Sequence, residues 1–447
     1  MELAGRRVLV IGMARSGIAV LRLLRSHEAT PIACDSRRME ELGDLAGEVG
    51  ALAAEYLPQA ELAERGIAAL GVDLIVISPG VPADLPLLET ARQAGIKVIG
   101  EVELASPDLR GPVLAITGTN GKTTTTSLAA HLLETAGIPM QLGGNIGRPV
   151  CDLVPTSKPH QWNVLELSSF QLETTESLSA DIAVCLNVTP DHLDRHHTME
   201  AYEGAKRRLF ELQKASGYAV LNADDKPTLR FGFAGPAKAE LFTLTNNATR
   251  QMWLEGDTIV YRGKPLLRRS QIPIPGLHNV ENVMAASLAA LLAGAPEAAV
   301  VRGVESFPGV EHRLEFVRER EGVRWYNDSK ATNVDATLKA IASFDNPLWI
   351  ILGGKDKHSD YRPLAEALQG KVRKALLIGQ ASPLIEQQIG AEVPIGHCGT
   401  IENAVAFAVQ AAAPGDVVLL APACASFDQF QSYEHRGKVF KQLVNAL

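Results

Sequence analysis

The sequence has few cysteines and no apolar run that is long enough to cross a membrane. Its five cysteines lie far apart among 447 residues and lack the spacing of metal sites or disulfide frameworks. The longest apolar run, from Ala285 to Val301, is interrupted by Gly, Pro, Ser and Glu, so it predicts a core helix and a turn. The N-terminal residues lead directly into an apolar strand pattern, so we expect no signal peptide. These features predict a cytoplasmic protein with reduced thiols.

The chain also lacks an excess of basic residues. It has 43 Lys and Arg against 51 Asp and Glu, which gives a net charge of −8. A nucleic-acid-binding protein would show a basic stripe, so we expect no nucleic-acid partner. Small anionic ligands are not excluded, because a local cluster is sufficient to bind them. The hydrophobic fraction of 46% allows several cores, and the length predicts about three domains.

Strand and helix patterns alternate along the chain, which predicts an α/β fold with parallel sheets. Residues 1–103 predict a Rossmann-like N-terminal domain. Residues 104–309 predict a central P-loop ATPase-like domain, in which a parallel sheet is joined by a small β-rich part from about Ala239 to Ile274. Residues 310–447 predict a Rossmann-like C-terminal domain.

The segment LAITGTNGKTTTT, from Leu114 to Thr126, predicts a strand, a glycine turn and a helix. Such a turn lets backbone N–H groups approach phosphate, and the start of the helix adds a favourable dipole. Lys122 would then reach the outer phosphates, and the Thr123 hydroxyl would bind Mg²⁺. The full Walker pattern has a glycine where this chain has Ile116, so an ordinary glycine turn before a helix is the alternative.

Two later strand patterns end in potential metal ligands. Glu166 lies in the apolar run WNVLELS, and His192 lies in VTPDHLDRH. Ligands collect at the carboxyl ends of parallel strands, and a buried carboxylate is costly unless it is paired or bound to metal. A structural acid with a local partner is the alternative for Glu166, and a structural zinc site is the alternative for the His/Asp cluster. By composition alone, Lys206 is a solvated lysine on an amphipathic helix.

The first strand is followed by GMARSG, a GxGxxG frame with Ala14 at the middle position. With Asp35 after the second strand, this pattern could be a degenerate NAD fingerprint. The Cβ of Ala14 would hinder the close approach of a pyrophosphate.

At this point the sequence resembles the Mur ligases. The resemblance covers essentially the whole chain, in order, through the motifs TGTNGKTTT, GGNIG, LELSSFQLE, LNVTPDHLDRH, PGLHNVENVMAA, EHRLE and YNDSKATN. The motifs SPGV, GGKDK and APACASFDQF make the chain look like the members that add D-glutamate. The resemblance implies an ATP- and Mg²⁺-dependent, monomeric ligase of peptidoglycan precursor synthesis. It would join UDP-N-acetylmuramoyl-L-alanine to D-glutamate through an acyl phosphate.

The resemblance also implies roles for individual residues. Residues implied in catalysis are Lys122, Asn145, Glu166, His192 and Lys206. Residues implied in ATP binding are Gly118, Thr119, Asn120, Gly121, Lys122, Thr123, Thr124, Asn279, Arg313, Asp328 and Lys330. Implied Mg²⁺ ligands are Thr123, Glu166, His192 and a carbamylated Lys206. The uridine pocket would be formed by Ser16, Asp35, Ser36, Arg37 and Ser78, and Asn145 would lie near the substrate and the transferring phosphate. D-Glutamate would be held by Thr332, Lys357, Ser426 and Tyr433.

Three alternatives are consistent with parts of this pattern. A sister ligase could add another amino acid or act on folate, although FDNPLW lacks the arginine of the diaminopimelate-type signature DNPR. A nicotinamide-dependent oxidoreductase would use the first domain but would leave the Gly–Lys–Thr loop and Glu166 unexplained. A non-catalytic nucleotide switch would bind ATP without turnover that depends on an amino acid.

Overall fold

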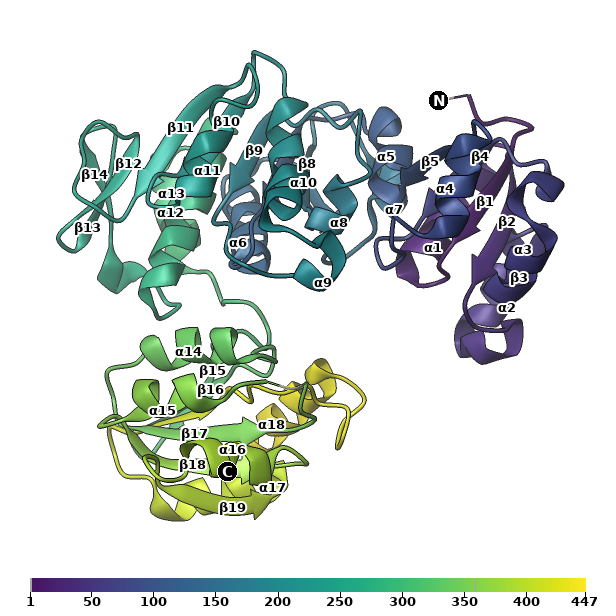
Figure 1. Ribbon diagram of the computed structural model, residues 1–447. Coiled ribbons are helices and arrows are strands. Elements are labelled where there is room, and N and C mark those ends of the chain that lie inside the picture. The colour runs from purple at the N-terminus through teal and green to yellow at the C-terminus, as the bar shows by residue number, and fades with distance from the viewer. Residues whose placement is uncertain (1, 358) are drawn as a thin grey trace. The chain divides into compact units, whose positions relative to one another are not determined.

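The computed structural model describes residues 2–357 and 359–447 and has the predicted α/β fold with three sheets (Figure 1). The chain forms two compact units. Unit 1 comprises Met1–Arg269 and Glu281–Val304, and unit 2 comprises Ser270–Val280 and Glu305–Leu447. Within the described residues, no helix combines the length and the apolar character needed to span a membrane.

The first sheet is entirely parallel, with the strand order β3-β2-β1-β4-β5. Its strands are β1 (Arg7–Ile11), β2 (Thr30–Asp35), β3 (Glu55–Pro58), β4 (Leu74–Ile77) and β5 (Lys97–Gly100). Its helices are α1 (Arg15–Ser26), η1 (Met39–Leu45), α2 (Ala46–Leu52), α3 (Gln59–Arg65), η2 (Ile67–Leu70) and α4 (Pro86–Gln93). The inner strands are almost continuously buried, as expected for a sheet covered on both faces. Their apolar runs were visible in the sequence, whereas the short, half-buried β3 was not predicted.

The second sheet has the order β14-β13-β12-β11-β10-β9-β6-β8-β7. It is parallel from β7 to β12, and β13 and β14 are antiparallel additions. The predicted β-rich part, from about Ala239 to Ile274, corresponds to β11 to β14. Its strands are β6 (Val113–Thr117), β7 (Met140–Gly144), β8 (Trp162–Glu166), β9 (Ile182–Cys185), β10 (Tyr218–Asn222), β11 (Lys238–Thr243), β12 (Met252–Glu255), β13 (Thr258–Tyr261) and β14 (Lys264–Arg268).

Helices of 3 to 16 residues accompany these strands, and several begin at a side-chain cap. The Thr198 hydroxyl, for example, accepts the N–H of Ala201 at 3.1 Å at the start of α10. The helices are α5 (Glu101–Ala105), η3 (Ser106–Asp108), α6 (Lys122–Thr135), α7 (Val150–Leu153), η4 (Val154–Thr156), α8 (Ser169–Leu172), α9 (Leu193–His196), α10 (Met199–Glu211), α11 (Lys226–Phe231), η5 (Arg269–Gln271), α12 (Leu277–Leu292) and α13 (Glu297–Glu305).

The third sheet has the order β15-β16-β20-β17-β18-β19, and only β15 is antiparallel to its neighbour. Its strands are β15 (Glu315–Arg320), β16 (Val323–Asn327), β17 (Leu348–Gly353), β18 (Val372–Ile378), β19 (Ile395–Gly399) and β20 (Val417–Leu420). Its helices are α14 (Val334–Ala342), α15 (Arg362–Leu368), α16 (Ser382–Ile389), α17 (Ile401–Ala411) and α18 (Tyr433–Asn445).

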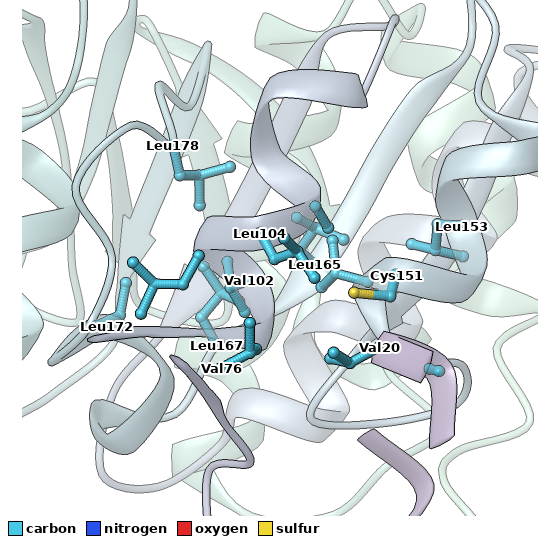
Figure 2. Packing of buried hydrophobic residues seen from close by; sticks show 14 of the residues in the cluster. Val20, Val76, Val102, Leu104, Cys151, Leu153, Leu165, Leu167, Leu172 and Leu178 are labelled. Atoms are coloured by element: carbon cyan, nitrogen blue, oxygen red, sulfur yellow. The ribbon is translucent and has the colours of Figure 1, made fainter. Parts of the chain in front are cut away.

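One hydrophobic core joins the first two sheets inside unit 1. Figure 2 shows how residues from α1, β4, α5, α7 and β8 converge at this junction, among them Val20, Val76, Leu104, Cys151 and Leu165. The junction also buries polar groups, since the Glu101 carboxylate accepts the N–H of Cys151 at 2.7 Å. The packing therefore holds the first and second sheets together as one body.

This shared core predicts that truncation of one junction residue weakens both sheets. Leu104 is 1% exposed, so Leu104→Ala should lower the free energy of unfolding of unit 1 by about 2–5 kcal/mol. Amide hydrogen exchange should show equal losses of protection in β1 and β8. Phe233→Ala, at a side chain that is 90% exposed, is the matched control and should change little. A loss confined to the first sheet would contradict the shared core.

Candidate functional site

The glycine turn after β6 has the geometry of an anion cradle. Gly118 and Gly121 have φ values of 146° and 84°, a backbone region that residues other than glycine rarely adopt. Asn187 fixes the turn from the neighbouring strand end, because its Oδ1 accepts the N–H of Asn120 at 2.8 Å and its carbonyl accepts the N–H of Thr119 at 2.9 Å. Helix α6 follows at once, so the first N–H groups of the helix lie directly after the turn.

Two lysines converge on this turn. Lys122 Nζ donates to the carbonyl oxygens of Gly118 at 3.0 Å and Thr119 at 2.8 Å. Lys206 Nζ, from α10, donates to the same Gly118 oxygen at 2.8 Å. Thr123 and Thr124 are buried in the first turn of α6. The Lys122 ammonium and the start of α6 make this turn favourable for a bound anion.

Lys206 does not match the expectation of a solvated lysine. It is 1% exposed, and its ammonium lies 4.6 Å from the centre of the Tyr202 ring. Burial, and next the charge of Lys122, lowers the pKa of Lys206 to about 7. The composition-based prediction was wrong because Lys206 lies on the inner face of α10, together with Tyr202, Leu209 and Phe210. A neutral buried amine is also the form that reacts with CO₂ to give a carbamate.

Glu166 lies at the end of β8, which pairs in register with β6 so that Glu166 is opposite Ile116. It is 1% exposed, and its Oε1 accepts a hydrogen bond from Asn145 Nδ2 at 2.7 Å. Its Oε2 is buried without a hydrogen-bond partner among the described residues. An orphaned carboxylate oxygen of this kind is well suited to a hard divalent cation. The alternative of a structural acid accounts for only one of the two oxygens.

His192 has a left-handed backbone with a φ of 53° and directly precedes α9. Its side chain is 47% exposed, and its ring centre lies 4.9 Å from that of Phe170. The nearby His196 is buried and hydrogen-bonded to Ser169, and burial, then the Arg195 charge, lowers the pKa of His196 to about 4. Residues 2–357 and 359–447 contain no group of three His, Cys, Asp or Glu side chains placed to hold a metal. The zinc alternative therefore has no support in the described part of the chain.

A cavity of about 640 Å³ lies at the carboxyl end of the first sheet. It is lined by every residue predicted for the uridine pocket: Ser16, Asp35, Ser36, Arg37 and Ser78. Asn145 and Gln171 of the central domain line it too. Since Asn145 also donates to Glu166, one side chain connects this cavity with the candidate metal ligand.

The Asp35 carboxylate is engaged in hydrogen bonds within the protein rather than available to the hydroxyls of a ribose. Its carboxylate accepts the N–H of Met13 at 2.6 Å and the Nε–H of Arg37 at 2.9 Å. Burial alone would raise the pKa of Asp35, but these hydrogen bonds lower it to about 2. A Cβ on Gly17 would overlap the carbonyl oxygen of Gly12, so glycine is needed there for the turn itself. These contacts do not match a dinucleotide fingerprint, and they leave the 42% exposed Arg37 guanidinium beside the cavity.

Unit 2 contains the remaining residues that are predicted to bind ATP. Asp328 is 8% exposed, and burial raises its pKa to about 7 against the opposing charge of Arg313. Asn279 Nδ2 donates to the carbonyl of Pro275 at 2.6 Å. The Lys330 ammonium lies 5.4 Å from the centre of the Tyr433 ring, and the main-chain N–H of Lys330 donates to the carbonyl of His312 at 3.1 Å. Lys330 and Tyr433 therefore share one part of the C-terminal domain.

The residues predicted for D-glutamate lie on loops that the main chain ties together. Lys355 and Ala425 exchange main-chain hydrogen bonds of 2.8 and 3.2 Å, which joins the loop of the exposed Lys357 to that of the buried Ser426. Tyr433 begins α18, and its carbonyl accepts the Ser329 hydroxyl at 2.8 Å. Thr332 is half-buried before α14.

Arg436, on α18, holds two of these loops. It is fully buried, and its guanidinium donates to the carbonyl oxygens of Ser329 at 2.9 Å and Cys424 at 3.2 Å. The segments that carry Lys330 and Ser426 therefore have fixed paths relative to each other.

Three contributing residues were not predicted. Asn187 fixes the glycine turn, Gln171 lines the large cavity, and the Tyr202 hydroxyl lies 3.0 Å from Thr119 Oγ1. Asn187 and Gln171 are neutral side chains inside recognised motifs, so they gave no signal from charge. Tyr202 could have been found, since it precedes Lys206 by one helical turn.

Known protein families match this chain in three successive parts. The Mur ligase MurD-like N-terminal domain matches residues 6–100, the Mur ligase middle domain matches residues 116–290, and the Mur ligase glutamate ligase domain matches residues 312–424.

Similar proteins extend over the full length. A UDP-N-acetylmuramoylalanine–D-glutamate ligase from Solibacter usitatus is 52% identical over 447 residues, which are 100% of this chain and 99% of the relative. The protein of the same name from Acidobacterium capsulatum is 48% identical and is covered to 97%. The solved UDP-N-acetylmuramate–alanine ligase of Thermotoga maritima has the same fold, with a TM-score of 0.63, 17% identity and 99% of both chains covered. The chain therefore belongs to the Mur ligase family.

Proposed function

We propose that this protein is an ATP-dependent ligase that joins UDP-N-acetylmuramoyl-L-alanine to the amine of D-glutamate in peptidoglycan precursor synthesis. The full-length relatives bear the name of this activity. The observation that carries the proposal is the position of Asn145, which lines the 640 Å³ cavity and donates to Glu166 beside the glycine turn. A nucleotide sugar bound in the cavity would thus have its carboxyl end next to a phosphate-transfer site.

The chemistry needs charge neutralisation more than covalent help from the protein. A carboxylate is a poor acyl donor, and transfer of the γ-phosphate to it creates a leaving group that the amine of D-glutamate then displaces. Lys122 and the N–H groups of the turn hold the transferring phosphate, and Asn145 orients the attacking carboxylate. Asn279, Arg313, Asp328 and Lys330 contribute to ATP binding. Thr332, Lys357, Ser426 and Tyr433 bind D-glutamate.

Mg²⁺ is the expected metal. Thr123, Glu166, His192 and a carbamylated Lys206 would hold it through oxygen and imidazole ligands. When bound, the ion neutralises charge that develops on the transferring phosphate. The support for this site is the unpartnered Oε2 of Glu166 together with a lysine amine poised for carbamylation. We further propose a cytoplasmic monomer with domains at 1–103, 104–309 and 310–447.

Phosphate release tests the proposed function directly. Purified protein receives ATP, Mg²⁺ and UDP-N-acetylmuramoyl-L-alanine, with D-Glu, L-Glu, L-Lys, meso-diaminopimelate or no amino acid. Release is expected only with D-Glu, and Lys122→Ala should lower the rate by a factor on the order of 10²–10³ because transition-state charge is left uncompensated. Release with another amino acid would move the specificity, and no release from folded protein that binds ATP would refute the proposal.

Carbamylation of Lys206 should depend on pH. Only the neutral amine attacks CO₂, so with a pKa of about 7 the carbamate should form above that pH and disappear as the pH falls below it. With ¹³C-bicarbonate, the carbamate resonance in the NMR spectrum should follow this dependence and be absent in Lys206→Arg. Lys214→Arg, at an exposed lysine in the same region, should retain the signal. A resonance that persists in Lys206→Arg would show that another amine is modified.

Arg37 should contribute to the affinity for the nucleotide sugar. Its guanidinium borders the cavity, and a charge-assisted hydrogen bond contributes about 1.5–3 kcal/mol. Arg37→Ala should therefore raise the KM for UDP-N-acetylmuramoyl-L-alanine roughly tenfold or more, with the KM for ATP unchanged. Arg25→Ala, at an exposed arginine on α1, is the control. Equal changes in both KM values would indicate damage to the fold rather than a contact with the substrate.

A further inference from the structure

Arg195 makes contacts in two directions that the proposed chemistry does not use. It follows His192 by three residues, and its side chain is only 12% exposed. We propose that Arg195 is a positioning residue that couples binding in the uridine pocket to the orientation of the metal ligand His192. This inference rests on the proposed function, since it assumes a nucleotide sugar in the large cavity and a divalent cation at His192.

The first contact reaches the wall of the uridine pocket. An Nη of Arg195 donates to the carbonyl oxygen of Val81 at 2.9 Å. Val81 lines the 640 Å³ cavity, and its N–H donates to the carbonyl of Ser78 at 2.9 Å. The Ser78 hydroxyl in turn donates to the carbonyl of Gly12 at 2.7 Å. A guanidinium from the central domain therefore fixes the turn that forms one side of the pocket.

The second contact reaches His192 through an aromatic ring. The guanidinium carbon of Arg195 lies 4.8 Å from the centre of the Phe170 ring, within the range of a cation–π interaction. Phe170 contacts His192 with a centroid distance of 4.9 Å and stacks on His196 at 5.4 Å. The half-exposed His192 ring also has Asp191 at 3.6 Å and the Tyr202 ring centre at 6.3 Å, and Phe170 is the neighbour that Arg195 contacts. A shift of Arg195 would move Phe170 and thereby His192.

The chemistry of the side chain favours arginine at this position. One planar group must donate to a carbonyl and lie against a ring, and the ammonium of lysine cannot do both in this way. The Glu173 carboxylate, 3.4 Å away, offsets part of the charge. Another link between these two segments joins His197 to Asp84 at 3.2 Å, but both side chains are more than 60% exposed and the pair is screened by solvent. Arg195 is therefore the stronger connection.

Coupling between two binding sites is reciprocal, because each ligand changes the affinity for the other by the same factor. It can therefore be measured from binding alone, without turnover. Free Mn²⁺, observed by its EPR signal, reports metal binding with and without UDP-N-acetylmuramoyl-L-alanine. In the wild-type protein we expect the nucleotide sugar to tighten Mn²⁺ binding about fivefold or more. Arg195→Met keeps an unbranched side chain with apolar contact but removes the donor, and the enhancement should fall to near one. Binding of Mn²⁺ by the diphosphate itself is the same for every variant and cancels in the comparison.

The chain offers a matched control and a rescue. Arg230→Met removes a guanidinium that is 66% exposed and paired with Glu203, and it should leave the enhancement unchanged. Arg195 also lines a cavity of about 310 Å³, which gives small cations access to the position. Millimolar methylguanidinium should therefore restore the enhancement in Arg195→Ala. A purely structural role would not be rescued in this way.

The outcomes separate the inference from the proposed function. If the wild-type protein releases phosphate with D-Glu but Arg195→Met keeps the full enhancement, or the wild type shows none, the inference is wrong. If the wild type does not turn over, the proposed function fails first. Should Arg195→Met not fold, as judged by its circular dichroism, Arg195→Lys and the methylguanidinium experiment decide by the same criterion.

Discussion

The convergence of two lysines on the Gly118 carbonyl is the interaction on which the central domain depends. Lys122 approaches this oxygen from the start of α6 and Lys206 approaches it from α10. Each ammonium opposes the charge of the other, and burial makes their repulsion stronger than it would be in water. Burial and the charge of Lys122 lower the pKa of Lys206 to about 7, so this amine loses its proton readily. The glycine turn and α10 thereby bring a reactive lysine beside the predicted phosphate site.

The cavity predicted to bind uridine and this loop belong to one packed body. Their connection depends on a hydrophobic junction between two sheets, and Arg195 crosses from one side of that junction to the other by donating to the carbonyl of Val81. Buried polar contacts of this type are worth more than surface ion pairs, since they are not screened by water. The junction therefore also keeps the 640 Å³ cavity in a fixed position relative to Glu166 and the glycine turn.

The sequence allowed the fold class to be predicted because apolar strand runs and amphipathic helices alternate clearly. It did not reveal β3, in which only Leu57 of the four residues is fully buried and which lacks an apolar run. The uridine-pocket residues were predicted through family resemblance, and all of them line one cavity. The burial of Lys206 and the roles of Gln171 and Asn187 could not be predicted from composition. They depend on which face of a helix or which carbonyl a side chain meets, and this is decided by tertiary packing.

Arg436 has a consequence for how amino-acid specificity can change in such a protein. Its guanidinium donates to main-chain carbonyl oxygens and to the hydroxyl of Ser329, so part of the path of the Ser426 loop is fixed through main-chain atoms rather than through the side chains of the loop. Substitutions there alter the chemistry presented to a ligand without altering the backbone that presents it. In such a fold, the side chains that contact a ligand differ from the groups that hold the backbone in place. Substitutions of the contacting side chains can therefore change which substrate binds with little loss of stability.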